Sequence, residues 1–191
     1  MIIVISLLSV LSKLLERQVH KHLVTYLETR DLFHPLQSGF RRKLSCNTAL
    51  ARLTDSWLSA INRSDLSRDV FLDLEKAFDL VDHRILLSKL SVFLNSSSSL
   101  PFFCSYLRNR VQRVFINGSY SSEGTVKYGV PHRSVLGPVL FCIYINDPLL
   151  RIPSHSAECH MLADDTTLHT TRKSIVQIQK TLQFFLDRIS V

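Results

Sequence analysis

Glycine and proline are scarce in this sequence, which contains only 5 and 6 of them among its 191 residues. Disordered and low-complexity chains are usually rich in these residues and poor in apolar ones. Here 46% of the residues are hydrophobic. The composition therefore predicts a folded protein, and the length fits one domain with a substantial core.

Cysteine is also rare, and its spacing does not suggest metal or disulfide chemistry. The four cysteines are far apart in sequence, and no two of them form a Cys-x-x-Cys pair. Cys159 precedes His160, but two neighbouring residues do not build a tetrahedral site by themselves. We expect free thiols in a reducing compartment, and therefore an intracellular protein of the nucleus or cytoplasm.

Long apolar runs are missing as well. Residues 1–11 carry no charged side chain, but Lys13, Glu16 and Arg17 follow too soon for a membrane-spanning helix. A basic region before this stretch and a small-residue cleavage site after it are both absent, which argues against a secretory signal. We expect no membrane partner, and a small secreted or membrane-anchored protein stays open as the alternative.

Acidic residues are outnumbered, with 16 Asp and Glu against 23 Lys and Arg and a net charge of +7. A positive surplus suits a polyanionic partner such as nucleic acid, because each neutralised phosphate releases counterions. Many soluble proteins are also basic, so this indication needs a second, independent feature.

Hydrophobic periodicity predicts an α+β fold in which helices and strands alternate irregularly. Asp82 is expected to cap a helix that starts after it. Val70–Leu74 predicts a short central strand, Asn117-Gly118 predicts a hairpin turn, and residues 160–169 predict two strands around a turn at Asp164-Asp165. Further helices are expected over residues 10–29, 45–62, 102–110 and 139–146.

The first two of these helices should each bury one apolar stripe. In the first helix the stripe consists of Leu11, Leu14, Leu15, Val19, Leu23 and Leu27. The opposite face, which should be exposed, carries Lys13, Glu16, Arg17 and Lys21. In the second helix the stripe consists of Ala49, Leu50, Leu53, Trp57, Leu58 and Ile61.

Carboxylates in two segments stand apart from the rest of the sequence. Asp73 lies within Phe71–Asp79, and Asp164-Asp165 lie within Met161–Leu168. Taken singly, an Asp after a strand usually caps the next helix, and an Asp pair at a hairpin tip usually lies in solvent. Together, a strand end and a neighbouring hairpin can present carboxylates to two divalent cations, which is what nucleotidyl transfer needs. A metal-dependent phosphohydrolase would also use clustered aspartates.

The ordered set of motifs resembles the reverse transcriptases of non-LTR (LINE-type) retrotransposons over about residues 5–187. Phe71–His83 resembles their first palm motif, Gly129–Pro138 resembles the second, and Leu162-Ala-Asp-Asp165 resembles their F/Y-x-D-D signature. Other segments, before and between the motifs, match as well: Gln37–Arg41, Ser105–Arg110, Asn117-Gly118 and Ile143–Asp147. A phosphohydrolase would not explain this set.

The resemblance implies a polymerase palm, in which an antiparallel sheet has helices on one face, with partial, mostly helical fingers and no thumb. Residues 1–191 would form one domain fragment truncated at both ends, with fingers in 1–69 and the palm with inserted elements in 70–191. The implied activity is RNA-directed DNA polymerase. It would transfer nucleotides from a dNTP to a DNA primer 3′-hydroxyl on an RNA template, using two Mg²⁺ ions or, alternatively, Mn²⁺.

The same resemblance implies roles for individual residues. The backbone near Leu74 would lie beside the triphosphate, and Phe78 would exclude a ribose 2′-hydroxyl. From its spacing alone, Phe78 could equally be a core aromatic. Arg41 would lie near the template or nucleotide. The implied catalytic residues and metal ligands are Asp73, Asp164 and Asp165.

The second palm motif departs from the family pattern G-V-P-Q-G-S. Pro131 is followed here by His132 and Arg133, and all three would lie where the template–nucleotide pair is supported. If the backbone at Arg133 needs a positive φ, the arginine costs about 1 kcal/mol or more of strain. We therefore expect a degenerate copy without processive synthesis. The alternative is a non-catalytic, nucleic-acid-binding remnant of a reverse transcriptase.

Overall fold

The computed structural model describes residues 9–95, 98–131, 133–150 and 157–189. The chain divides into two compact units that alternate along the sequence. Unit 1 comprises Met1–Leu32 and Lys76–Tyr144, and unit 2 comprises Phe33–Glu75 and Ile145–Val191. In the part of the chain that is described, no helix is long and apolar enough to cross a membrane.

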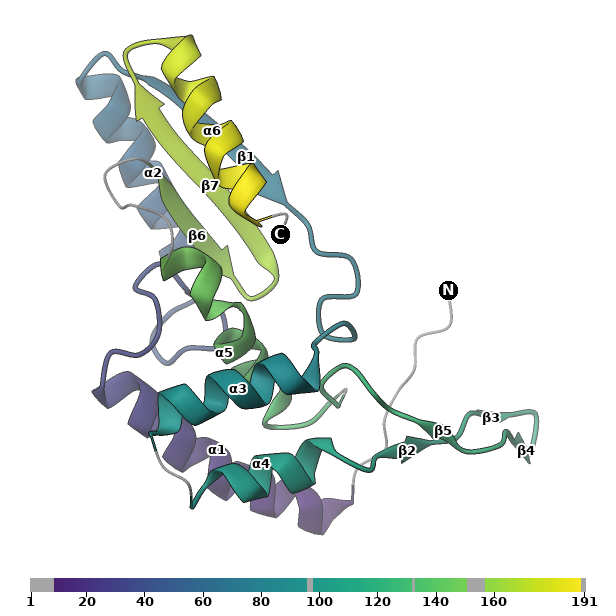
Figure 1. Ribbon diagram of the computed structural model, residues 1–191. Coiled ribbons are helices and arrows are strands. Elements are labelled where there is room, and N and C mark those ends of the chain that lie inside the picture. Colours follow the sequence, from purple (N-terminus) through teal and green to yellow (C-terminus); the bar gives the residue numbers. More distant parts are fainter. Residues whose placement is uncertain (1–8, 96–97, 132, 151–156, 190–191) are drawn as a thin grey trace. The chain divides into compact units, whose positions relative to one another are not determined.

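Unit 2 is built on a three-stranded antiparallel sheet in the order β1-β7-β6 (Figure 1). The strands are β1 (Leu66–Leu72), β6 (Glu158–Leu162) and β7 (Asp165–Arg172). β7 is central because it pairs with both of the others. The prediction that Val70–Leu74 forms a central strand was wrong, since β1 lies at an edge and its Phe71 is 71% exposed. An apolar run does not distinguish an edge strand from a central one.

Helix α6 (Ile175–Ile189) covers one face of this sheet and was not predicted. It lies in front of the sheet in Figure 1. The core between helix and sheet includes Val70 and Leu72 of β1 and Leu168 of β7. It is completed by the buried residues Ala157, Cys159, Met161, Ile178, Leu182 and Phe185. Burial raises the pKa of the Cys159 thiol to about 12, so this cysteine behaves as a small apolar side chain.

Helix α2 (Cys46–Asn62) covers the opposite face of the sheet. Trp57 Nε1 donates to Asp69 Oδ2 over 2.9 Å, and Ser56 Oγ donates to Glu158 Oε2 over 3.0 Å. The α+β palm with an antiparallel sheet is thus confirmed, but helices lie on both faces rather than on one. The second helix layer is joined by polar contacts, which hydrophobic periodicity does not reveal.

Unit 1 contains three complete helices, α1 (Val10–Thr29), α3 (His83–Leu94) and α4 (Leu100–Leu107), among its described residues. Asp82 caps α3 as predicted, because its carboxylate accepts from the backbone N–H groups of Arg84 and Ile85. α5 (Gly137–Leu150) belongs to this unit as far as Tyr144.

Two small β-ladders complete unit 1. β2 (Val111–Gln112) pairs with β5 (Gly124–Thr125), and β3 (Phe115–Ile116) pairs with β4 (Ser119–Tyr120). The turn between β3 and β4 is Asn117-Gly118, with φ angles of 51° and 81°. Positive φ at both central residues is the type I′ pattern, which confirms the predicted hairpin.

The expected apolar stripes of α1 and α2 are only partly buried. Leu11, Leu14 and Leu15 are 78%, 51% and 57% exposed, whereas Leu23 and Leu27 of the same predicted stripe are buried, together with Val24. α2 buries Leu53 and Ala60. Leu50, Leu58 and Ile61 are exposed. Periodicity shows which face of a helix is apolar, but the length of that face which is covered depends on tertiary contacts.

Candidate active site

Strand pairing in unit 2 brings the three predicted carboxylates to one end of the sheet. The β1–β7 register ends with Leu72 opposite Thr166. Asp73 follows Leu72, and Asp165 precedes Thr166, so these two backbone positions lie side by side. Asp164 lies next to Asp165 in the turn between β6 and β7. Two segments far apart in sequence therefore meet at this end of the sheet.

The side chains at this end of the sheet are not already arranged as a metal site. Among the residues that the structure describes, no three His, Cys, Asp or Glu side chains are grouped closely enough to hold one ion. Asp73 and Asp165 are exposed, and Asp164 is half-buried. Carboxylate oxygens are ligands that Mg²⁺ prefers, and like charges repel when brought together. The backbone positions and donor type fit a shared metal site, whereas the side-chain positions would have to change.

The turn that carries Asp164 has an unusual backbone. Leu162 pairs with Asp165, which leaves Ala163 and Asp164 as the two turn residues. Ala163 has φ = 61°. Positive φ at the first central residue only is the type II′ pattern, which usually has glycine there. An alanine in this region costs on the order of 1–2 kcal/mol, and such strain persists where the surroundings impose it.

A short loop segment, His34–Gly39, runs along the outer edge of β6. Met161 N donates to Leu36 O over 3.0 Å, and Ser38 N donates to Met161 O over 2.7 Å, in a parallel bridge. Gln37 is fully buried, and its Oε1 accepts from Gly39 N at 2.7 Å and from Ala163 N at 3.4 Å. We call this segment the bracing loop because it contacts the Asp164 turn directly.

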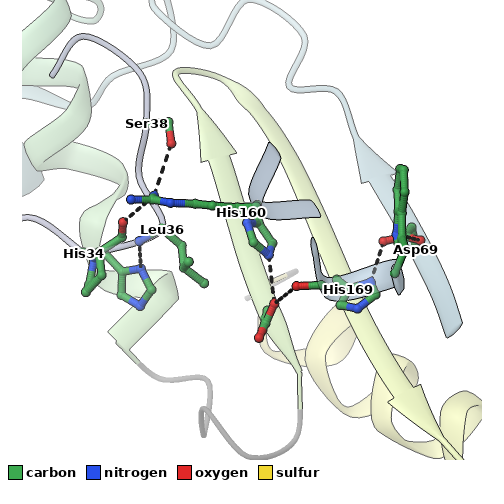
Figure 2. Close-up of polar contacts among 11 residues, drawn as sticks. His34, Leu36, Ser38, Asp69, His160 and His169 are labelled. Atoms are coloured by element: carbon green, nitrogen blue, oxygen red, sulfur yellow. Dashed lines mark hydrogen bonds and ion pairs between the residues drawn. The ribbon is translucent and has the colours of Figure 1, made fainter. Parts of the chain in front are cut away.

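The bracing loop is itself fixed to two helices. His34 N donates to Oδ1 of the buried Asn146 in α5 over 2.9 Å. Arg52 of α2 donates to Pro35 O over 2.8 Å and to Ser38 Oγ over 3.5 Å (Figure 2). The loop is therefore hydrogen-bonded both to α5 and to α2.

Arg41 also contacts the bracing loop. Its Nη1 donates to His34 O over 3.1 Å and to Gln37 O over 3.3 Å. Its guanidinium lies 5.2 Å from the centroid of the Phe33 ring. In this arrangement Arg41 stabilises its own loop, and a contact with template or nucleotide stays a prediction.

In unit 1 the first and second palm motifs pair with each other. Gly129 N donates to Val81 O over 2.8 Å, and Val130 N donates to Phe78 O over 3.0 Å. His83 Nε2 lies 2.7 Å from Gly129 O, and since a carbonyl only accepts, this nitrogen carries the hydrogen. The two motifs, separated by nearly fifty residues, thus form one structural element.

Residues 3–191 match the family described as reverse transcriptase (RNA-dependent DNA polymerase). The chain belongs to this family. The match covers nearly the whole sequence and confirms the resemblance seen in its motifs. Reverse transcriptases are enzymes, and members of the family generally use divalent metal ions.

Individual relatives agree with this assignment. The RNA-directed DNA polymerase from mobile element jockey of Drosophila melanogaster is 32% identical, over 95% of this chain and 20% of that protein. The probable RNA-directed DNA polymerase from transposon BS of the same species is 36% identical, over 75% of this chain and 16% of that protein. The chain thus spans about a fifth of the length of the curated relatives it matches.

Solved reverse transcriptase folds are also similar. Telomerase from Candida albicans, in complex with a TWJ fragment of telomeric RNA, superposes with a TM-score of 0.72 at 13% identity. The match covers 92% of this chain and 32% of that one. Apo telomerase from Candida tropicalis, truncated from the C-terminal domain, gives a TM-score of 0.68 at 16% identity, over 94% of this chain and 37% of that one. At such identities the likeness shows the shared fold.

Within this reverse transcriptase fold, Phe78 is a packed aromatic. Its ring stacks on that of the buried Phe141 in α5, with centroids 4.4 Å apart. A core role and a gate role are compatible when one face of a ring is packed and the other is open, so the gate stays a prediction. Leu74 follows Asp73 in unit 2 and is 41% exposed.

The second palm motif shows the cost of its departure from the reverse transcriptase pattern. Arg133 has φ = 61° and an exposed side chain, so the condition for backbone strain at this position is met. Pro131 is half-buried, and its carbonyl accepts from Ser134 N over 3.1 Å. His132 lies outside the described residues.

A buried carboxylate stabilises the residues after Arg133. Glu16 of α1 is 2% exposed. Its Oε2 accepts from Val135 N at 2.6 Å and from Leu136 N at 3.3 Å. These N–H groups immediately precede α5, where backbone donors lack intrahelical partners and a negative charge is favourable. Sequence periodicity assigned Glu16 to the exposed face of α1, so this role was missed.

The α2 face of the sheet carries a second group of polar side chains, remote from Asp164. His169 Nδ1 donates to Asp69 Oδ1 over 2.8 Å, and His160 Nε2 donates to Glu158 Oε2 over 3.0 Å (Figure 2). Burial raises the pKa of Glu158, but hydrogen bonds from His160 and Ser56 outweigh it and leave the pKa lowered.

A cavity of about 390 Å³ lies beside these side chains, lined in part by Asp55, Arg63 and Arg172. Arg172 and Asp165 are at opposite ends of β7. The lining residue of β7 nearest to the carboxylates is His169, four residues from Asp165. At the rise of a β-strand this is a separation of roughly 13 Å. The cavity is therefore not the candidate active site.

Proposed function

We propose that this chain carries the palm and part of the fingers of an RNA-directed DNA polymerase of a retrotransposon. Fingers would lie within residues 1–69 and the palm within 70–191. The reaction is nucleotidyl transfer from a dNTP to the 3′-hydroxyl of a DNA primer paired to an RNA template. It would take place inside the cell, in the nucleus or cytoplasm, where these substrates occur.

In this proposal Asp73, Asp164 and Asp165 hold two Mg²⁺ ions, with Mn²⁺ as an alternative. When bound, the ions supply activation of the 3′-hydroxyl and neutralisation of the triphosphate. The backbone near Leu74 approaches the triphosphate. Phe78 excludes the ribose 2′-hydroxyl.

The proposal also assigns contacts with the substrates to the second palm motif and to Arg41. Pro131, His132 and Arg133 contact the template–nucleotide pair in this proposal, and Arg41 contacts the template or nucleotide. The net charge of +7 favours binding of the nucleic acids. RNA is also the molecule present in the Candida albicans telomerase complex.

The observation that carries the proposal is the β1–β7 register, which sets Asp73 beside Asp165 and the Asp164 turn. Strand pairing fixes these backbone positions. Side-chain rotation would bring the carboxylates toward a common ion, and the ion itself would offset their repulsion.

Primer extension tests the proposal. The full chain is incubated with poly(rA)·oligo(dT), dTTP and Mg²⁺, and incorporation is compared between wild type and Asp164→Asn. Loss of a metal ligand removes several kcal/mol of transition-state stabilisation, so incorporation should fall about a thousandfold. Asp187→Asn, on the exposed face of α6, is the matched control and should behave as wild type. Equal incorporation by wild type and Asp164→Asn would contradict the proposal.

A second candidate function is a non-catalytic, nucleic-acid-binding remnant of a reverse transcriptase. It is favoured by Arg133, which places a strained, long cation where the family has glycine. RNA binding that weakens steeply with salt, without Mg²⁺-dependent incorporation by the wild type, would select this candidate.

A further inference from the structure

We propose that Gln37 and Gly39 are positioning residues that set the backbone of the Asp164 turn. The inference rests on the proposed function, since the turn matters for catalysis only if Asp164 and Asp165 hold the ions. Both residues would act through Ala163 rather than through a reacting group.

The turn needs an external support. Ala163 adopts φ = 61°, a conformation that L side chains other than asparagine and aspartate rarely adopt without one. Asp164 follows immediately, so any relaxation of Ala163 would change the direction in which Asp164 leaves the turn. A support for Ala163 is therefore a support for the carboxylate.

Gln37 supplies a hydrogen-bond acceptor at this point. Its side chain is fully buried, and Oε1 accepts both from Gly39 N and from Ala163 N. Within the described part of the chain, Nε2 is buried without a hydrogen-bond partner. An unpaired buried donor is unfavourable, and an apolar side chain of similar length would avoid it. The hydrogen bonds that Oε1 accepts from Gly39 N and Ala163 N account for the presence of an amide at this position.

Gly39 supplies close contact between two backbones. A Cβ atom at this position would lie 2.1 Å from Ala163 N, 2.7 Å from Ala163 Cα and 3.0 Å from Leu162 C. Backbone atoms in a hairpin have little freedom to move aside. Any residue other than glycine would therefore displace the turn or the bracing loop.

The bracing loop also covers the outer edge of β6, which offers a simpler reason for its presence. An uncovered edge exposes unpaired backbone groups, and the hydrogen bonds of Leu36 and Ser38 with Met161 satisfy them. Edge covering requires neither the Gln37 carbonyl on Ala163 nor a glycine at position 39. These two features point to the turn.

Amide hydrogen exchange, followed residue by residue by NMR on the full chain, tests the positioning without any need for activity. Gln37→Met removes the acceptor at similar length, and the Ala163 amide should then exchange about tenfold faster. Gln37→Glu keeps an oxygen at the same position and should restore protection. The Leu168 amide, at the centre of the sheet, should exchange at the wild-type rate in both variants.

Steady-state primer extension tests the catalytic consequence. Displacement of a reacting group by about 1 Å can cost on the order of a hundredfold in rate. Gly39→Ala should therefore lower kcat for dTTP incorporation by about a hundredfold, with KM changed less than twofold. Gly124→Ala is the control, since its Cβ would meet its nearest neighbour, Gln112 O, at 3.9 Å. It should leave kcat unchanged.

The outcomes separate this inference from the proposed function. Wild-type exchange at Ala163 in Gln37→Met, or equal acceleration at Leu168, would overturn the positioning role. Unchanged kcat in Gly39→Ala, with an active wild type, would overturn it as well. A third outcome is an inactive wild type together with faster exchange of the Ala163 amide in Gln37→Met. It would refute the proposed polymerase activity and the catalytic role of the turn, but it would confirm that Gln37 stabilises the turn.

Discussion

Two turns in this protein contain the same backbone strain in different surroundings. Ala163, before Asp164, and Arg133, in the second palm motif, both have φ = 61°. Ala163 is contacted by the backbone of Gly39 and by the side chain of Gln37. Arg133 is exposed. The comparison teaches that a strained non-glycine residue can be imposed by its neighbours in one place and simply tolerated in another.

The largest expected effect on stability is at Gly129, which lies a few residues before Arg133. Its φ is 85°, and a Cβ there would lie 2.9 Å from Asp79 O. Gly129→Ala should lower the free energy of unfolding by about 3 kcal/mol, since strain and overpacking add. Gly118→Ala has a similar φ of 81° but open space around it, and should cost only about 1–2 kcal/mol. Urea unfolding would measure both, and equal losses would mean that the Asp79 contact is unimportant.

The next largest effect on stability is expected at Glu16, whose carboxylate accepts hydrogen bonds from the residues that follow Arg133. Glu16→Ala leaves the backbone N–H groups of Val135 and Leu136 without their acceptor and should cost about 2 kcal/mol. Glu16→Gln keeps an acceptor oxygen and should cost less. Thermal unfolding of the two variants, compared with the wild type, gives the difference. If both variants matched the wild type, Glu16 would not stabilise the start of α5.

A smaller effect, this time an increase in stability, is expected when the backbone strain at Arg133 is removed. Arg133→Gly should raise the free energy of unfolding by about 0.5–1 kcal/mol, because relief of positive φ is partly offset by the greater freedom of glycine in the unfolded chain. Arg133→Lys keeps a long cation and should be neutral. Chemical denaturation would report both, and a loss of stability in Arg133→Gly would show that the arginine makes a contact of its own.

The smallest expected effect is a pH dependence of stability caused by His34. The backbone of this residue connects the bracing loop to Asn146. Burial, with the charges of His160 and Arg41, lowers the pKa of His34 below its usual 6.5. The unfolded chain therefore binds a proton more readily, and stability present above pH 6.5 is lost as the pH falls toward the lowered pKa. Urea midpoints at pH 7.5, 6.5 and 5.5 should decrease less in His34→Asn than in the wild type. His22→Gln, an exposed substitution, should keep the wild-type slope.

Local patterns in the sequence predicted much of the fold. The helix over residues 10–29, the cap at Asp82 and the turn at Asn117-Gly118 depend on neighbours in sequence, and all three were confirmed. The edge position of β1 and the partial burial of α1 and α2 depend on what packs against them. Those features were not available from periodicity. The central position predicted for β1 was wrong, and the stripes predicted for α1 and α2 were confirmed only in part, at Leu23, Leu27 and Leu53.

For the candidate site, the sequence motifs supplied the residues but not their supports. Asp73, Asp164 and Asp165 were selected by type and motif, and strand register then set their backbones together. Gln37 and Gly39 were visible only as part of a matching segment. Their contacts with Ala163 span more than 120 residues, and no local pattern encodes contacts over such a distance. The turn itself falls at Ala163-Asp164, one residue earlier than predicted.

The division of unit 2 into Phe33–Glu75 and Ile145–Val191 has a consequence for synthesis on the ribosome. The bracing loop emerges early, but β6 and β7 emerge only after all of Lys76–Tyr144 has been translated. Contacts of such high sequence separation form slowly and late. A nascent chain that stalls between these segments would hold the first half of unit 2 with nothing to pair with, and we expect it to be a target for chaperones or proteases until β7 arrives.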